Sequence, residues 1–216
     1  MLNRAEVLRY MGVSHCDATI DAMISCAEAK VIQAAQPKHV SKHVSITVDP
    51  GKHWTEIDGV LIDSRDLAQH LQGCREGFLF AGTLGVGVDV LVKRYNLTDV
   101  PMVPVIQAVA AAYIEDYVDQ AQKELEEYAA QKGLYLRPRY SPGYGDFQLE
   151  NQRFLFAALE IPKRIGVTLT DSLFMVPFKS ITAVIGLSDD PSLCHINKCM
   201  SCSQKNCPFR RETDDE

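Results

Sequence analysis

The sequence predicts an α+β fold in which helices at the amino end and centre pack on a mixed, largely antiparallel sheet. Two stretches, residues 16–33 and 103–132, repeat apolar side chains every three or four positions, as amphipathic helices do. Residues 38–48 alternate apolar and polar side chains, which indicates a strand. Residues 180–187 are apolar except for Thr182 inside the run, which indicates a further strand.

The amino-terminal part of the chain contains capping and turn signals that divide it into short elements. Asn3 and Ser64 are residue types that accept hydrogen bonds from the first amides of a helix, so each is expected to precede one. Asp-Pro-Gly at residues 49–51 predicts a turn. The elements expected here are helices over residues 4–10, 16–33 and 65–72 and strands over residues 38–48 and 60–62.

The central part of the chain contains the strongest helix signal, over residues 103–132, and Gly133 is suited to end that helix in a left-handed conformation. A buried strand over residues 78–81 leads into a glycine-rich loop that matches neither a dinucleotide nor a phosphate-loop motif. Its glycines favour close approach of either a ligand or a packed helix. The later elements expected are a helix over 148–158, strands over 165–170 and 180–187, and a bend at 175–178.

Composition and charge exclude several classes of function for this 216-residue chain. The formal net charge of −6 argues against nucleic-acid binding and against attachment to an anionic membrane surface. The amino terminus lacks the apolar run of a secretion signal, and no apolar stretch reaches the length of a membrane span. Seven cysteines without an export signal indicate a reducing compartment, so we expect a cytoplasmic protein.

Isolated histidines and cysteines in the first third of the chain have simple structural interpretations. His39, His43 and His53 lie near the strand over 38–48 without a carboxylate at useful spacing, so solvated side chains are favoured over a metal site. The cysteines outside the carboxyl-terminal cluster are expected to be small core residues. These are Cys16, Cys26 and Cys74.

The segment Arg-Pro-Arg-Tyr-Ser-Pro-Gly-Tyr-Gly-Asp, residues 137–146, is the strongest candidate for a binding site. Its prolines and glycines predict a stiff, sharply turned backbone. Arg139 offers a planar donor fork for a carboxylate, and Tyr144 offers an aromatic face for a flat ring or a cation. An ordinary surface turn is the alternative that composition alone allows. Glu115, in the middle of the long helix, could face a cationic ligand.

Four cysteines in a C-x4-C-x2-C-x4-C pattern mark the carboxyl-terminal tail and predict a metal or cluster site. Both zinc and an iron–sulfur cluster fit this ligand set, and redox chemistry or a tail without metal are the alternatives. We expect one α+β domain over residues 1–190 and a cysteine-rich tail over residues 191–216. The predicted ligands are Cys194, Cys199, Cys202 and Cys207.

The residues from 139 onward resemble the reactivation domain of cobalamin-dependent methionine synthase. The family carries an Arg-x-x-x-Gly-Tyr signature, and residues 139–144 fit it, with Pro142 in register. The later segments Gly-Val-Thr-Leu-Thr-Asp-Ser (166–172), Met-x-Pro (175–177) and Ser-Ile-Thr-Ala (180–183) fit as well. The resemblance covers roughly residues 75–190 and implies the activation-domain fold.

In that family the domain binds S-adenosylmethionine and presents its methyl group to oxidised cobalamin, while a flavoprotein supplies an electron. The resemblance implies that Arg139 pairs with the methionyl carboxylate and that Glu115 lies near the positive methionyl end. It also implies that Pro142, Gly143 and Tyr144 shape the pocket.

The sequence lacks the Asp-x-His-x-x-Gly motif that ligates cobalamin, so the corrinoid is expected on a separate methionine synthase or corrinoid protein. The first hypothesis is therefore an S-adenosylmethionine-binding reactivation partner. A flavodoxin-type or ferredoxin-type protein would donate the electron, and the sequence identifies no catalytic residue in this chain. The alternative is a non-catalytic metal- or iron–sulfur-bearing adaptor with a vestigial pocket. A general small-molecule methyltransferase is disfavoured, because the strand–glycine-loop–acid pattern of the usual doubly wound sheet is absent.

Overall fold

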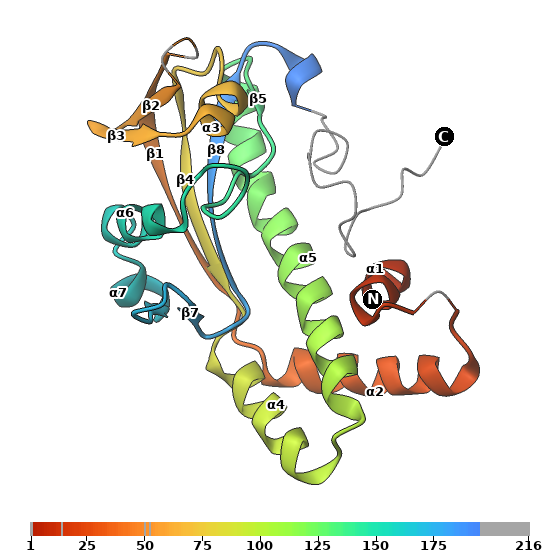
Figure 1. Cartoon of the computed structure of the whole chain (residues 1–216). Coiled ribbons are helices and arrows are strands. Elements are labelled where there is room, and N and C mark those ends of the chain that lie inside the picture. The colour runs from red at the N-terminus through yellow and green to blue at the C-terminus, as the bar shows by residue number, and fades with distance from the viewer. Residues whose placement is uncertain (1, 14, 50, 52, 195–216) are drawn as a thin grey trace.

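The chain forms an α+β fold built on a six-stranded sheet, as the sequence predicts (Figure 1). The computed structural model describes residues 2–13, 15–49, 51 and 53–194. The sheet has the order β3-β2-β1-β4-β8-β5, and each of its neighbouring strands pairs antiparallel. The strands are β1 (Lys38–Asp49), β2 (Trp54–Ile57), β3 (Val60–Asp63), β4 (Glu76–Thr83), β5 (Tyr135–Leu136) and β8 (Ser180–Ser188), and a separate ribbon pairs β6 (Thr168–Leu169) with β7 (Met175–Val176).

Strands β4 and β8 form the centre of the sheet, and both are covered on their two faces. They pair along their whole lengths, from Glu76 opposite Leu187 to Thr83 opposite Ser180. Seven of the eight residues of β4 are buried, which explains why its sequence is almost continuously apolar rather than alternating. The long strand β1 pairs with β4 on the other side, where its alternation matches one buried and one more exposed face.

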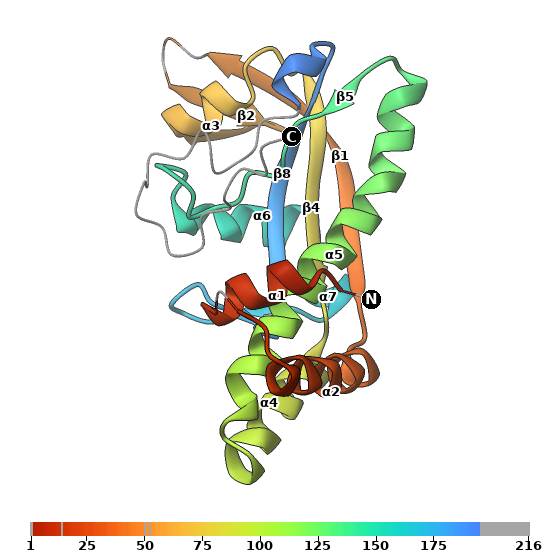
Figure 2. The same cartoon turned by 90° about the vertical axis from the view of Figure 1, so that its right-hand side faces the viewer.

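One face of the sheet is covered by α5 (Met102–Gln131), a helix of 30 residues that crosses the sheet diagonally (Figures 1 and 2). Its apolar stripe includes Ile106, Val109 and Val118, which are fully buried in one core cluster with side chains of β4 and β8. Alanines on α5 allow close packing of the helices beside its first half. These helices are α1 (Arg4–Met11), α2 (Ala18–Ala34) and α4 (Val86–Thr98).

The opposite face of the sheet is covered by shorter helices that share a second core cluster, on the side away from α5 in Figure 1. Phe147 and Leu155 are fully buried there, against Leu79 and Val184 of the central strands. The sheet therefore separates two apolar cores, and a side chain at its edge belongs to one core or the other. The helices on this face are α3 (Arg65–His70), α6 (Gln152–Ala158) and α7 (Ile161–Ile165), and the short 3-10 turns η1 (Leu149–Asn151) and η2 (Pro191–Leu193) complete the fold.

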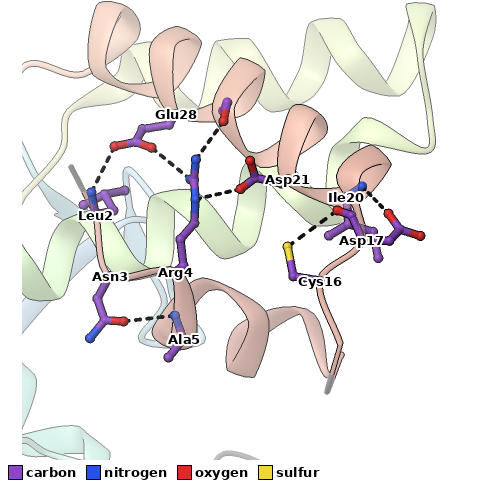
Figure 3. A network of polar contacts seen from close by, with 10 residues as sticks. Leu2, Asn3, Arg4, Ala5, Cys16, Asp17, Ile20, Asp21 and Glu28 are labelled. Carbon is purple, nitrogen blue, oxygen red and sulfur yellow. Dashed lines mark hydrogen bonds and ion pairs between the residues drawn. The ribbon is translucent and has the colours of Figure 1, made fainter.

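The two amino-terminal helices are fastened together by a polar network around Glu28 of α2, shown in Figure 3. The carboxylate of Glu28 accepts hydrogen bonds from the Leu2 amide and from Arg4, each at 3.0 Å, and the Arg4 guanidinium also pairs with Asp21 at 3.1 Å. The Asn3 side chain accepts hydrogen bonds from the first amides of α1, so the predicted cap is confirmed. Glu28 is buried, and these two hydrogen bonds offset the free-energy cost of burying its carboxylate.

Three local features of the structure differ from the expected elements. The glycine-rich stretch after β4 leads directly into helix α4, and a Cβ at Gly87 would lie 2.0 Å from the backbone oxygen of Ala34. The glycine therefore serves a packed helix, one of the two alternatives. The strand expected over residues 165–170 forms only at β6, residues 168–169. Residue 165 instead ends helix α7, because Gly166, with φ +72°, stops the helix there. The short strand β2 was not expected at all.

The isolated histidines and cysteines also differ in part from expectation. His39 Nδ1 lies 2.9 Å from the Tyr117 hydroxyl, and His43 pairs with Glu76, so both have protein partners rather than only solvent. Cys74 is buried, as expected, but Cys16 and Cys26 are exposed. Cys16 precedes α2, and Cys26 lies on the side of that helix turned away from the core. Among the described residues, none of the helices combines the length and apolar character that a membrane crossing requires.

Candidate functional site

The predicted binding segment forms the outer edge of the sheet beyond β8. The Arg137 amide donates to the Gly186 carbonyl at 2.8 Å, which continues the pairing that β5 begins. Tyr140 then exchanges two hydrogen bonds with Val184, at 2.8 and 2.9 Å. Because the segment is tied to β8 at these two points, the residues between them are held in place. Arg139 lies between the two points and extends toward helix α5.

The guanidinium of Arg139 is buried against three side chains of α5. Its Nη2 lies 3.0 Å from a Glu115 oxygen and 2.7 Å from an Asp119 oxygen, and its Nη1 donates to Gln122 Oε1 at 3.0 Å. The side chain of Arg139 is only 6% exposed, whereas those of Glu115 and Asp119 are 32% and 62% exposed. A buried cation is thus held by two carboxylates that still reach water, which is the arrangement expected of a site open on one side.

The three α5 residues share one face of the helix because four and three positions separate them. Two carboxylates one turn apart repel each other, and the guanidinium between them offsets this repulsion. Together, Glu115, Asp119 and Arg139 carry a formal charge of −1. Such a group can hold a zwitterionic amino-acid end, because the guanidinium suits its carboxylate and the acidic side chains suit its ammonium.

The turn after Arg139 is built as the sequence predicts. Pro142 is buried, and Gly143 has φ +97°, a conformation that favours glycine. The Gly143 amide donates to the Phe147 carbonyl at 2.7 Å and closes the turn. Tyr144 at its tip is 51% exposed, and its ring meets that of Tyr140 edge-on with 5.9 Å between centroids. A half-exposed tyrosine on a stiff turn is available to stack against a flat ring.

Asp146 anchors the turn to the start of helix α3. Its carboxylate accepts hydrogen bonds from the Ser64 hydroxyl and from the amides of Arg65 and Asp66, the amides at 2.9 and 3.1 Å. Burial by itself would raise the pKa of Asp146, but these hydrogen bonds outweigh it and hold the pKa below its ordinary value. A Cβ at Gly145 would lie 2.1 Å from Asp66 Oδ2, so this junction leaves little space for a larger residue.

The structure brings some of the predicted residues together and directs others elsewhere. Glu115 and Arg139 form an ion pair, although they are 24 positions apart in sequence. Tyr144 lies over Tyr140, whose ring also lies 4.7 Å from that of His70 in α3. Arg139 therefore contacts the α5 side of the sheet edge, and Tyr144 contacts the α3 side. A ligand that touches both would have to cross the edge between them.

Asp119 and Gln122 belong to this cluster, and sequence reasoning missed them. The sequence signal that could have found them is their spacing from Glu115, which places all three on one helical face.

Only the first of the four predicted metal ligands can be placed. Cys194 follows η2, and its thiol donates to the Asp190 carbonyl at 3.3 Å. Burial raises the pKa of Cys194, and the charge of nearby Arg137 opposes that effect. Cys199, Cys202 and Cys207 lie outside the described residues. Within the described part of the chain, no group of three or more histidine, cysteine and acidic side chains is arranged to hold a metal ion.

Comparisons with known proteins gave one family match and one similar fold. A sequence model described as "Vitamin B12 dependent methionine synthase, activation domain" matches residues 78–206. This range includes Glu115, the whole 137–146 segment and the first three cysteines of the tail. A solved structure, the crystal structure of the MetH reactivation domain bound to AdoHcy, superimposes with a TM-score of 0.62 at 14% identity. The match covers 81% of this chain and 68% of that one. A comparison with curated protein sequences found no match.

Proposed function

The chain belongs to the activation-domain family of vitamin B12-dependent methionine synthase, and we propose that it binds S-adenosylmethionine for the reductive methylation of a cobalamin held by a partner. The observation that carries this proposal is the buried guanidinium of Arg139 between Glu115 and Asp119. A guanidinium beside acidic side chains selects a zwitterionic ligand over a simple anion or cation. The amino-acid end of S-adenosylmethionine is such a zwitterion.

Further support comes from the turn and from the similar solved structure. Tyr144 offers an exposed aromatic face for the adenine ring. Because the turn that carries it is already stiff, binding costs less conformational entropy. The solved structure to which this fold is similar is described as bound to AdoHcy, the product that S-adenosylmethionine becomes after losing its methyl group. In our proposal Arg139 binds the carboxylate and Glu115 faces the positive end of the ligand.

The proposed reaction consumes one S-adenosylmethionine, one electron and one oxidised cobalamin of the partner. The methyl–sulfur bond breaks, a methyl–cobalt bond forms, and S-adenosylhomocysteine is released. The protein in this scheme binds and orients the methyl donor and supplies no proton. In our proposal the corrinoid is held by a partner methionine synthase or corrinoid protein, because the matched family is the activation domain of a vitamin B12-dependent methionine synthase. The electron is assigned to a flavodoxin-type or ferredoxin-type donor.

Calorimetric titration with S-adenosylmethionine tests the binding step. Wild-type protein should bind the ligand, and Arg139→Gln should weaken binding by about tenfold to a hundredfold, because a hydrogen bond to a charged partner is lost. Arg153→Gln is the matched control, since Arg153 is an exposed residue of α6 on the other side of the sheet. Absence of binding by the wild type, or equal binding by Arg139→Gln, would remove the proposal.

The second candidate function is a metal-bearing adaptor or electron-transfer protein, and the position of Cys194 favours it. This first cysteine of the four-cysteine pattern is half-buried beside the buried Arg137, whose charge suits a group of thiolates. Metal analysis after anaerobic purification separates the possibilities. A brown protein with stoichiometric iron supports a cluster, colourless protein with zinc supports a structural site, and protein without metal rejects this candidate.

A further inference from the structure

The hydrogen-bond pattern of Arg139 is incomplete on one edge of the guanidinium. Its Nη1 and Nη2 are bonded to α5, but its Nε is buried and has no hydrogen-bond partner within the residues that the structure describes. Buried donors without partners are rare, and each is a candidate for a missing acceptor. A guanidinium presents Nε and an adjacent Nη as a fork that accepts both oxygens of one carboxylate.

The two carboxylates on Nη2 differ in how readily each could leave. Asp119 is 62% exposed and Glu115 is 32% exposed, so the Asp119 carboxylate regains water more easily when its ion pair breaks. Asp119 lies one turn further along α5 than Glu115, and in the described residues Arg139 is the only ion-pair partner that it has. Glu115 also pairs only with Arg139 among the described residues, so the difference in exposure decides: the more exposed acid, Asp119, is the exchangeable one.

We propose that Asp119 is a displaceable counter-ion, which holds the Arg139 guanidinium until the carboxylate of the bound amino-acid ligand replaces it. This inference rests on the proposed function and adds a residue that controls ligand selection at the same site. The incoming carboxylate bonds to Nη2 and also to Nε, so it satisfies the buried donor that the shorter Asp119 side chain leaves unbonded. Glu115 remains in place and faces the ligand's ammonium group.

The inference makes a prediction opposite to that for an ordinary binding residue. Asp119→Asn removes the competing charge and nearly preserves side-chain shape, so S-adenosylmethionine should bind about threefold to tenfold more tightly than to the wild type. Decarboxylated S-adenosylmethionine has the ammonium but no carboxylate, so its affinity should not change. Glu115→Gln should weaken the binding of both ligands. Calorimetric titration of the full chain measures all of these affinities.

The matched control is Asp116→Asn, because Asp116 is a neighbouring exposed acid on α5 whose described hydrogen bond goes to Gln120 rather than to Arg139. It removes the same charge without touching the guanidinium, and thermal unfolding of both variants verifies that they fold. Weaker binding of both ligands by Asp119→Asn would mean that Asp119 contacts the ammonium, and this would overturn the inference. An effect no larger than that of Asp116→Asn would overturn it as well, while the proposed function would stand. No binding of S-adenosylmethionine by any of the proteins, wild type included, would overturn both.

Discussion

Arg137 and Arg139 are two positions apart and both are buried, yet their side chains lie on opposite faces of the sheet. Arg137 lies on the α3 face, where its Nη2 donates to the Gln72 carbonyl at 2.8 Å and its Cγ packs over Gly186 beside Cys74. Arg139 lies on the α5 face, where its partners are the side chains of Glu115, Asp119 and Gln122. Pro138 between them accepts a hydrogen bond from His70 and fixes the change of direction.

The difference shows how a structural arginine can be told from a binding one when both are buried. A backbone carbonyl cannot be released without unfolding the chain near it, so the Arg137 contact is permanent. Carboxylates on an exposed helical face can exchange with water or with a ligand, so the Arg139 contacts are replaceable. The burial of an arginine therefore does not tell a structural role from a binding role, whereas the exposure of its hydrogen-bond partners does.

Alanine at the two positions gives the largest expected contrast in stability. Arg137→Ala leaves a cavity and an unbonded Gln72 carbonyl, so it should lower the free energy of unfolding by about 2–4 kcal/mol. Arg139→Ala leaves two carboxylates that water can reach, so it should cost about 1–2 kcal/mol. Urea unfolding of both variants measures this contrast. A larger loss of unfolding free energy for Arg139→Ala than for Arg137→Ala would mean that Arg139, and not Arg137, is the structural arginine.

Filling the space above Gly186 is expected to have the next largest effect. A Cβ there would lie 2.6 Å from Cys74 Sγ, 2.8 Å from Leu71 Cδ2 and 3.2 Å from Arg137 Cγ. Gly186→Ala should therefore destabilise the fold by about 1–3 kcal/mol through overpacking. Adding Cys74→Ala removes the nearest atom and should recover part of the loss in chemical denaturation. The affinity for S-adenosylmethionine should remain that of the wild type, since the Arg139 face is untouched.

The smallest expected effect concerns the junction of the binding turn with α3, and it depends on pH. The pKa of Asp146 is lower in the folded chain than in the unfolded chain, so its stabilisation is present above the unfolded pKa of about 3.9 and is lost as pH falls through the folded pKa. Asp146→Asn should cost about 1 kcal/mol near neutral pH, as loss of a helix cap does.

Unfolding of Asp146→Asn and wild type, compared between pH 6 and pH 2, measures this contribution. The difference in stability between them should shrink below pH 4, and a constant difference would mean that the Asp146 charge is not responsible.

The long periodic elements of the fold were predictable, and the short ones were not. Helix α5 and strands β1 and β8 are long enough for their hydrophobic patterns to be distinguished from chance. Their predicted bounds therefore agree with the structure within a few residues. Helix α4 was missed because Gly85 and Gly87 dominate its start, where Gly87 packs closely on the end of α2 and Gly85 on Gln36 beyond it. Helix α7 has five residues, too few for a period to be recognised.

The site was predictable only in part, for a different reason. The Arg139 to Tyr144 signature is contiguous in sequence, so a family resemblance can find it. The carboxylate partners of Arg139 lie more than 15 positions earlier, and only the packing of α5 on the sheet edge brings them to the guanidinium. The direction of Tyr144 toward Tyr140 depends on the Pro138 turn and on the bridge to Val184, neither of which a local pattern specifies.

In the proposed function the Arg139 guanidinium binds the carboxylate of the amino-acid ligand. A crystal structure of the chain with S-adenosylhomocysteine tests it most directly. We expect the ligand carboxylate within hydrogen-bonding distance of Arg139 Nε and Nη2, with Glu115 still paired and Asp119 released. A structure in which Arg139 keeps both acidic partners, while the nucleoside is bound elsewhere, would rule out this role for Arg139.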